Sequence, residues 1–210
     1  MRIVNFLLFL FMLIGQMDAQ IGVRVATNIA NFNVSEDLGD AAELNYKMGF
    51  GLGVYYKVAL DENLSFQPEI NYVQQGAKIG GEEQGFTVSG VFKFNYIQIP
   101  ILAKYQFGDP DRVNFFVEGG PYVGFGIGKG KQETCFDGDC DEDEISYGNS
   151  DDDDIKNPDF GIQLGGGINI NSKLSFDIRY VYGIQNLINE SDEDDFLRNT
   201  AFNIGVGYSF

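Results

Sequence analysis

The chain has 210 residues and a formal net charge of −17, with 27 glycines, no histidine and no tryptophan. We expect no nucleic-acid partner, because binding to phosphates requires a basic face. The lack of histidine excludes Ser-His-Asp and Cys-His hydrolases and most zinc enzymes, so we expect no enzymatic activity. The length suits one domain with a sizeable core.

The first 19 residues predict a secretory signal peptide, which leaves residues 20–210 as a single domain. Arg2 gives a positive start, an apolar run follows over residues 3–15, and the small residue Ala19 precedes the expected cleavage point. The apolar run is shorter than the ~20 residues that a membrane-spanning helix needs. An uncleaved anchor helix is the alternative. No later stretch is long and apolar enough for such a helix, so any further membrane crossing must use strands.

Apolar residues alternate with small or polar ones along most of the remaining chain, which predicts β-strands. In chain order the predicted strands are residues 21–31, 47–60, 64–77, 96–107, 114–128, 160–170, 174–183 and 200–210. Short turns at 61–63, 108–111 and 171–173 alternate with longer loops at 33–45, 78–91, 129–158 and 186–199. Strands of ~9–11 residues, an even strand count and this alternation of connections are typical of membrane barrels.

The polar face of each predicted strand indicates which face contacts lipid. A face exposed to water normally carries many lysines and glutamates, whereas these faces are mostly Gly, Ala, Ser, Asn and Gln. Small residues suit the narrow lumen of an eight-stranded barrel. We therefore predict an all-β fold, an eight-stranded antiparallel up-and-down transmembrane barrel with its apolar face outward. A soluble barrel is the alternative.

A few charges of both signs fall on the predicted lumen face, where they must pair. They are Arg24, Lys47, Lys57, Glu69, Lys104, Glu118, Asp177 and Arg179. We interpret these residues as a network that plugs the lumen rather than as catalytic groups. Because eight strands leave room only for side chains, we expect little conductance.

Acidic residues gather in the predicted loops 129–158 and 186–199. The simplest interpretation is a solvated loop whose charges repel one another. Alternatively, Asp137, Asp139 and Asp141 have the alternating carboxylates of a calcium loop, although the glycine and glutamate of an EF-hand are missing. Calcium is thus the one candidate cofactor.

The two cysteines, Cys135 and Cys140, lie in the same predicted loop. Export to an oxidising compartment favours a local disulfide between them, and two free thiols are the alternative. The spacing fits no zinc motif. A ring this small should stabilise the barrel little.

Two strands carry a family resemblance. The segments Tyr-Ile-Gln-Ile-Pro-Ile-Leu-Ala-Lys-Tyr (96–105) and Phe-Val-Glu-Gly-Gly-Pro-Tyr-Val-Gly (116–124), together with the terminal Gly-Tyr-Ser-Phe, resemble the PorT-like outer-membrane β-barrel domains of Bacteroidota. The resemblance implies an eight-stranded barrel in the outer membrane of a Gram-negative bacterium, placed there by the barrel-insertion machinery. One founding member of that family takes part in type IX secretion and gliding, and the family has no catalytic motif.

We therefore expect a structural or interaction role for an outer-membrane barrel that displays long acidic extracellular loops. Its expected partners are outer-membrane lipid, lipopolysaccharide and proteins of a cell-envelope or secretion assembly. The alternative is a narrow channel, or a barrel that binds a small ligand or a cation.

Overall fold

The computed structural model describes residues 19–35, 43–83, 86–109, 112–137, 139–150, 152–171, 173–189 and 195–210. These residues form eleven strands: β1 (Ala19–Val34), β2 (Glu43–Ala59), β3 (Leu64–Gln75), β4 (Ala77–Glu83), β5 (Phe86–Phe107), β6 (Asn114–Gly126), β7 (Gly130–Phe136), β8 (Asp139–Ile145), β9 (Asp159–Ile170), β10 (Leu174–Gly183) and β11 (Leu197–Ser209). The predicted signal peptide lies outside the described residues, except for Ala19 at the start of β1.

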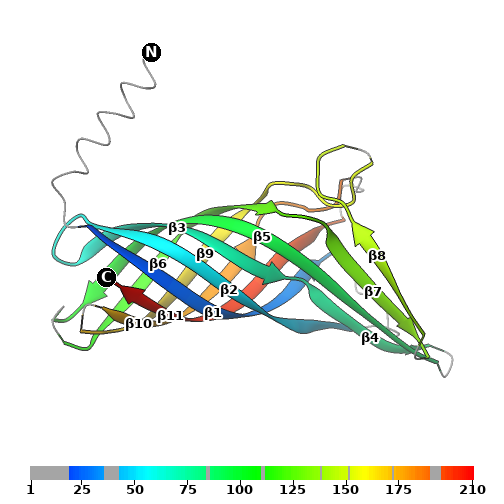
Figure 1. Ribbon diagram of the computed structural model, residues 1–210, viewed down its shortest axis with the longest axis horizontal. Helices are drawn as coiled ribbons and strands as arrows, with labels where there is room; N and C mark the ends of the chain where they lie inside the picture. Colours follow the sequence, from blue (N-terminus) through cyan, green and yellow to red (C-terminus); the bar gives the residue numbers. More distant parts are fainter. Residues whose placement is uncertain are drawn as a thin grey trace, which may run out of the picture.

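Eight of the strands close into a barrel (Figure 1). Around its wall the order is β3, β2, β1, β11, β10, β9, β6 and β5, and pairing between β3 and β5 completes the circle. All of these neighbours are antiparallel. Because β4, β7 and β8 lie outside the circle, consecutive barrel strands are neighbours. The predicted eight-stranded up-and-down barrel is confirmed.

The two faces of the barrel wall follow the period-two pattern. Apolar side chains on the outside are exposed, among them Val25, Phe50, Leu52, Val54, Ile70, Ile101, Val117, Leu164, Ile178 and Ile204. The alternate residues point inward and are buried, such as Arg24 and Asn28 on β1. This exterior would be unfavourable in water and suits the hydrocarbon of a bilayer.

Two predicted loops are wrong, because they contain strands. Residues 78–91 form most of β4 and the first part of β5, and residues 129–158 contain the β7–β8 hairpin. With the first residues of β2 they make a second sheet in the order β2, β4, β5, β7, β8. This projecting sheet extends from the end of the barrel opposite the C-terminus (Figure 1). We call that end the outer end.

The projecting sheet departs from the barrel at Gly76. Between the pairs Gly51↔Val73 and Tyr46↔Ala77, β2 has one residue more than the facing strand, so the register shifts there. Gly76 has a φ of 130°, and a Cβ atom on it would lie 2.0 Å from the carbonyl oxygen of Phe92. Only glycine fits this conformation and this close approach. The predicted strand 64–77 is therefore divided into β3 and β4.

An apolar core occupies the outer end of the barrel rather than its middle. It consists of Phe32, Val73, Ala77, Phe94, Tyr96, Ile145, Ile155 and Leu187. Barrel strands, β8 and the segments after β8 and β10 all contribute to it. This core joins the projecting sheet to the barrel, since Phe32 of β1 packs against Phe92 and Phe94 of β5.

Candidate functional site

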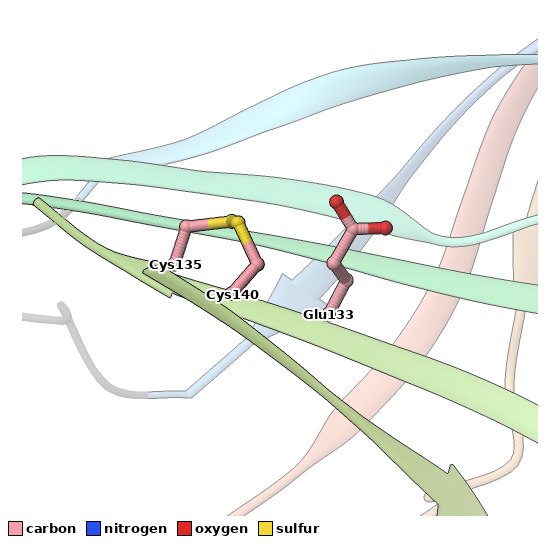
Figure 2. A group of neighbouring side chains, drawn as sticks. All are labelled: Glu133, Cys135 and Cys140. Atoms are coloured by element: carbon pink, nitrogen blue, oxygen red, sulfur yellow. A yellow bond between two sulfur atoms is a disulfide. The ribbon is translucent and has the colours of Figure 1, made fainter. Parts of the chain in front are cut away.

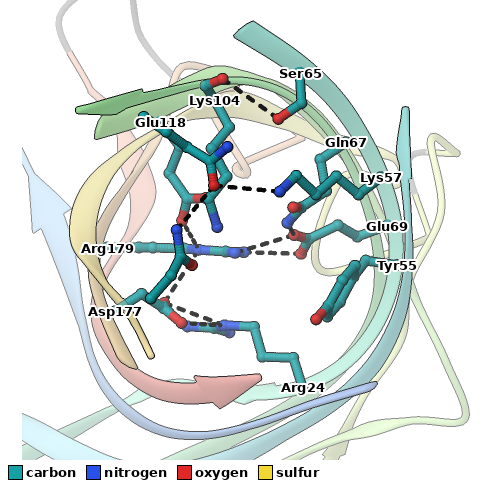
Figure 3. A network of polar contacts seen from close by, with 12 residues as sticks. Arg24, Tyr55, Lys57, Ser65, Gln67, Glu69, Lys104, Glu118, Asp177 and Arg179 are labelled. Carbon is teal, nitrogen blue, oxygen red and sulfur yellow. Dashed lines mark hydrogen bonds and ion pairs between the residues drawn. The ribbon is translucent and has the colours of Figure 1, made fainter. Parts of the chain in front are cut away.

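The lumen contains a network of charged side chains from five strands (Figure 3). Six of the eight predicted lumen charges meet in it: Arg24, Glu69, Lys104, Glu118, Asp177 and Arg179. All six are buried. Three are cations and three are anions, so the network is balanced in charge.

Arg179 of β10 is the centre of this network. Its guanidinium donates to both carboxylate oxygens of Glu69, at 2.8 and 3.0 Å, and its Nε donates to Glu118 at 2.6 Å. The Nε is also 3.2 Å from a carboxylate oxygen of Asp177. Glu69 lies on β3, and β10 is the fourth strand from β3 in either direction around the wall. The Arg179–Glu69 pair therefore spans the lumen.

The remaining charges attach to this centre. Arg24 Nε donates to the two oxygens of Asp177, at 3.1 and 3.0 Å. The ammonium of Lys104 is 3.8 Å from Glu118 and 3.4 Å from the centre of the Phe116 ring. Paired in this way, the buried charges avoid most of the cost of an isolated charge. The arrangement braces opposite walls and fills the lumen with side chains.

The other two predicted lumen residues lie outside the network. Lys57 donates to the side-chain oxygen of Gln106 at 3.2 Å, close to the network in Figure 3. Lys47 is buried at the outer end, beside the register shift at Gly76, and makes no ion pair with a residue in the described part of the chain. Lys47 and Lys57 occupy positions of β2 that face the lumen. Their spacing along the strand, however, does not show which acidic side chains they can contact.

A buried cluster at the outer end was missed by the sequence analysis. The carboxylate of Asp159 is fully buried and accepts hydrogen bonds from Tyr122 at 3.0 Å and Asn199 at 3.1 Å. In the sequence, Asp159 falls between the predicted loop 129–158 and the predicted strand 160–170. Its place directly before the alternating segment of β9 was the one available signal.

The predicted disulfide residues face each other across the β7–β8 hairpin. Cys135 pairs with Cys140 in register, and their sulfurs are joined (Figure 2). Glu133 lies next to them, and among the described residues this is the one group of three side chains near enough to share a metal ion. Since both sulfurs are in the disulfide, the group is a poor metal site.

The carboxylates proposed for calcium lie at the tip of the same hairpin. Asp137 occupies the turn with a φ of 46°, and Asp139 and Asp141 are exposed on β8. These three carboxylates do not form a group at metal-binding distance. Calcium binding stays a prediction.

Replacing Cys135 and Cys140 with serine should leave the urea resistance of the barrel unchanged. The disulfide lies at the end of the projecting sheet, outside the eight barrel strands, and it closes a short ring. Amide hydrogen exchange should become faster in β7 and β8 only. A lower urea midpoint for the barrel itself would contradict this expectation.

Ion pairs line one face of the projecting sheet and were also missed. Lys93 contacts Glu133 at 2.7 Å, Lys131 contacts Glu142 at 2.6 Å, and Lys129 pairs with Glu144. The hydrogen bond and the charge of Lys131 lower the pKa of Glu142. Each exposed pair is a weak contribution to stability. Together the three ion pairs hold in place acidic side chains that would repel one another in an unpaired loop.

The polarity of the exterior and that of the lumen indicate the environment of the barrel. The outside is apolar over the length of the strands, and the inside is polar and closed by charge pairs. Among the described residues, no helix is long and apolar enough to cross a membrane.

Comparison with known proteins gives the family. The model of the outer membrane protein beta-barrel domain matches residues 15–189. A comparison with curated protein sequences finds no match.

Solved structures of similar fold are membrane barrels of distant sequence. The attachment invasion locus protein Ail of Yersinia pestis is 15% identical, with 92% of this chain and 100% of that chain covered and a TM-score of 0.43. For OprG of Pseudomonas aeruginosa the identity is 11%, the coverage 93% and 98%, and the TM-score 0.45. For the outer membrane enzyme PagL these values are 12%, 89% and 98%, and 0.49.

The family match spans most of the chain and agrees with the closed barrel, its apolar exterior and its polar lumen. The strands therefore cross the outer membrane of a Gram-negative cell. The chain belongs to the outer membrane protein beta-barrel domain family.

Proposed function

We propose that this barrel is a non-catalytic interaction protein, which holds the projecting sheet at the cell surface for a partner in the cell envelope. The observation that carries the proposal is the exposed strand β8. It is the last strand of the projecting sheet, and its residues from Asp139 to Glu144 are all exposed. The sheet is roughly 25 Å long, as estimated from residues 86–93 of β5 and the rise per strand residue.

An exposed sheet edge is a template for another strand. The edge strand β8 carries five acidic residues among its seven, so repulsion opposes pairing with a second copy of itself. A partner with basic residues would meet no such repulsion. This charge pattern supports a protein partner that differs from the chain itself.

The resemblance to PorT-like domains suggests which kind of assembly the partner belongs to. The segments 96–105 and 116–124 resemble the PorT-like domains of Bacteroidota. On that basis we propose a role in a cell-envelope or secretion assembly, with insertion by the barrel-insertion machinery and contacts to lipopolysaccharide.

A narrow channel is the second candidate, because the fold is a closed barrel. The Arg179–Glu69 pair argues against a channel, because it spans the lumen and blocks it. We expect no unitary currents from the purified protein in planar bilayers. Stepwise currents that persist at the same size after removal of the loops would favour the channel instead.

Site-specific photo-crosslinking in living cells tests the interaction role. The probe replaces Phe136, which is 54% exposed at the end of β7. The matched control replaces Phe115, which is 64% exposed on the lipid-facing side of β6 near a short turn. We expect one discrete crosslinked protein from position 136 and none from position 115. Crosslinks to lipopolysaccharide alone, or none at all, would leave a passive structural barrel.

A further inference from the structure

A cavity of about 340 Å³ opens at the outer end of the barrel. Its walls come from the barrel, from the projecting sheet and from the segment after β8. They are Phe32, Val34, Leu44, Ile79, Phe92, Phe94, Gln132, Ile145, Asp154, Ile155 and Leu197. Nine of these eleven residues are apolar, and the volume is within the range of small ligand sites. Binding of an apolar group over apolar surface of this kind is favourable, because it removes that surface from water.

A row of carboxylates leads away from the cavity along β8. In the β7–β8 hairpin Gly130 pairs with Ile145, Gln132 with Asp143, and Thr134 with Asp141. Paired and alternate residues share a face of a sheet. Asp143, Asp141 and Asp139 therefore lie on the same face as Ile145, which lines the cavity. They are spaced ~7 Å apart, two residues along a strand.

The two faces of β8 differ in how their charges are compensated. Glu142 and Glu144, on the face away from the cavity, are paired with Lys131 and Lys129. Asp139, Asp141 and Asp143 make no ion pair with a residue in the ranges that the structure describes. The negative charge on the cavity side is thus uncompensated.

Another carboxylate stands at the cavity wall. Asp154 accepts hydrogen bonds from the backbone N–H of Ser146 at 2.7 Å and from its hydroxyl at 2.9 Å. These bonds lower the pKa of Asp154, so the carboxylate is ionised at neutral pH. An anionic ligand would be repelled here.

We propose that the cavity receives one apolar side chain of a basic peptide segment, whose lysine or arginine residues lie along Asp143, Asp141 and Asp139. The regular spacing of the row matches alternate side chains of an extended chain, which favours a peptide over a single-headed amphiphile. The apolar anchor supplies affinity, and the charges supply orientation and the rate of encounter. This inference rests on the proposed interaction role and specifies the chemistry of the partner.

Peptide binding to the purified protein in phosphatidylcholine nanodiscs tests the proposal. The probe is the fluorescent peptide Phe-Ser-Lys-Ser-Lys-Ser-Lys, together with its reverse sequence, because the direction of binding is open. The matched probe has serine in place of phenylalanine, and empty nanodiscs give the background. By fluorescence anisotropy, one phenylalanine probe should bind at least about tenfold more tightly than its serine partner, as expected for burial of a large apolar side chain.

Variants of the protein separate the cavity from general attraction. Val34→Trp and Ile79→Trp, made separately, each fill the cavity and should abolish the advantage of phenylalanine while leaving the serine probe unchanged. Asp141→Asn with Asp143→Asn should weaken both probes severalfold. The control, Glu142→Gln with Glu144→Gln, removes the same charge from the other face of the same strand and should weaken them less. Folding of each variant is checked by its heat-dependent gel migration.

Several results would overturn the inference. Equal binding of the phenylalanine and serine probes, or an equal loss in the two double variants, would mean attraction by net charge only. The crosslinking experiment shows whether only the cavity proposal fails or the proposed interaction role fails as well. If the probe at position 136 captures the same protein in Val34→Trp cells as in wild type, the interaction role stands and the cavity is not its anchor. If wild type captures no protein, the interaction role itself fails.

Discussion

Replacing Arg179 with methionine should destabilise the folded barrel by about 3–5 kcal/mol, the usual cost of removing one partner from a buried ion pair. Arg179 is the only cation paired with Glu69 among the described residues, and it also contacts Glu118 and Asp177. Without it, three carboxylates share the lumen with Arg24 and Lys104. Glu69 keeps hydrogen bonds from Gln67 and Asn71, which compensate for only part of the lost charge. Urea unfolding in lipid vesicles measures the change.

A double variant distinguishes charge from packing. Adding Glu69→Gln to Arg179→Met removes the carboxylate that has lost its partner and restores the charge balance of the network. The double variant should therefore be more stable than Arg179→Met alone, since an unpaired buried charge costs more than a neutral amide. If Arg179→Met unfolds at the wild-type urea concentration, the network does not brace the barrel. If the double variant is the less stable of the two, packing rather than charge explains the loss.

The barrel wall could be predicted from the sequence because lipid and lumen impose opposite requirements on alternate residues. Leu52 and Val54 face outward between glycines that face inward, and this contrast repeats in every barrel strand. The lumen charges could be recognised by the same rule. Their pairing could not, because the contact between Arg179 and Glu69 depends on which strands lie opposite each other after closure.

The projecting sheet was missed because three of its strands, β4, β7 and β8, have the composition of a solvated loop. In β8, for example, acidic residues occupy both faces, so apolar alternation is absent. The signals were of another kind. The dipeptide Asp137-Gly138 is a strong sequence signal for a two-residue hairpin turn, and the cysteines are placed symmetrically around it in the sequence. In the resulting register Lys131 lies directly opposite Glu144 and diagonal to Glu142, with which it forms an ion pair. For this hairpin the available signal was therefore cross-strand pairing rather than apolar alternation.

The cavity also depends on information that the local pattern lacks. Phe32 and Leu197 come from opposite ends of the chain and meet only through the pairing of β1 with β11. Ile145 appears in the sequence as a single apolar residue after an acidic run. Its role as a wall of the cavity depends on the hairpin returning β8 to the barrel mouth.

Replacing Leu52 with arginine should destabilise the barrel by about 2–4 kcal/mol, the cost of a cationic side chain near the middle of the bilayer. Leu52 is 54% exposed on the outer face of β2, between Phe50 and Val54, which are exposed on the same face. Burial in hydrocarbon removes the water that would otherwise solvate the guanidinium. Urea unfolding in lipid vesicles and heat-dependent gel migration give the loss of stability and of assembly.

Position along the strand supplies the control for this substitution. Met48 is exposed on the same face of β2, four residues nearer the outer end. Met48→Arg should therefore cost only ~0–1 kcal/mol, because its side chain can reach the membrane interface.

Gly51→Arg tests the lumen face of β2. A Cβ atom at Gly51 is 3.5 Å from Val73, which leaves room for a methyl group but not for a long side chain. Assembly of Leu52→Arg at wild-type stability would mean that this face of β2 does not contact lipid. A cost for Met48→Arg equal to that of Leu52→Arg would place the bilayer higher on the barrel, nearer the projecting sheet.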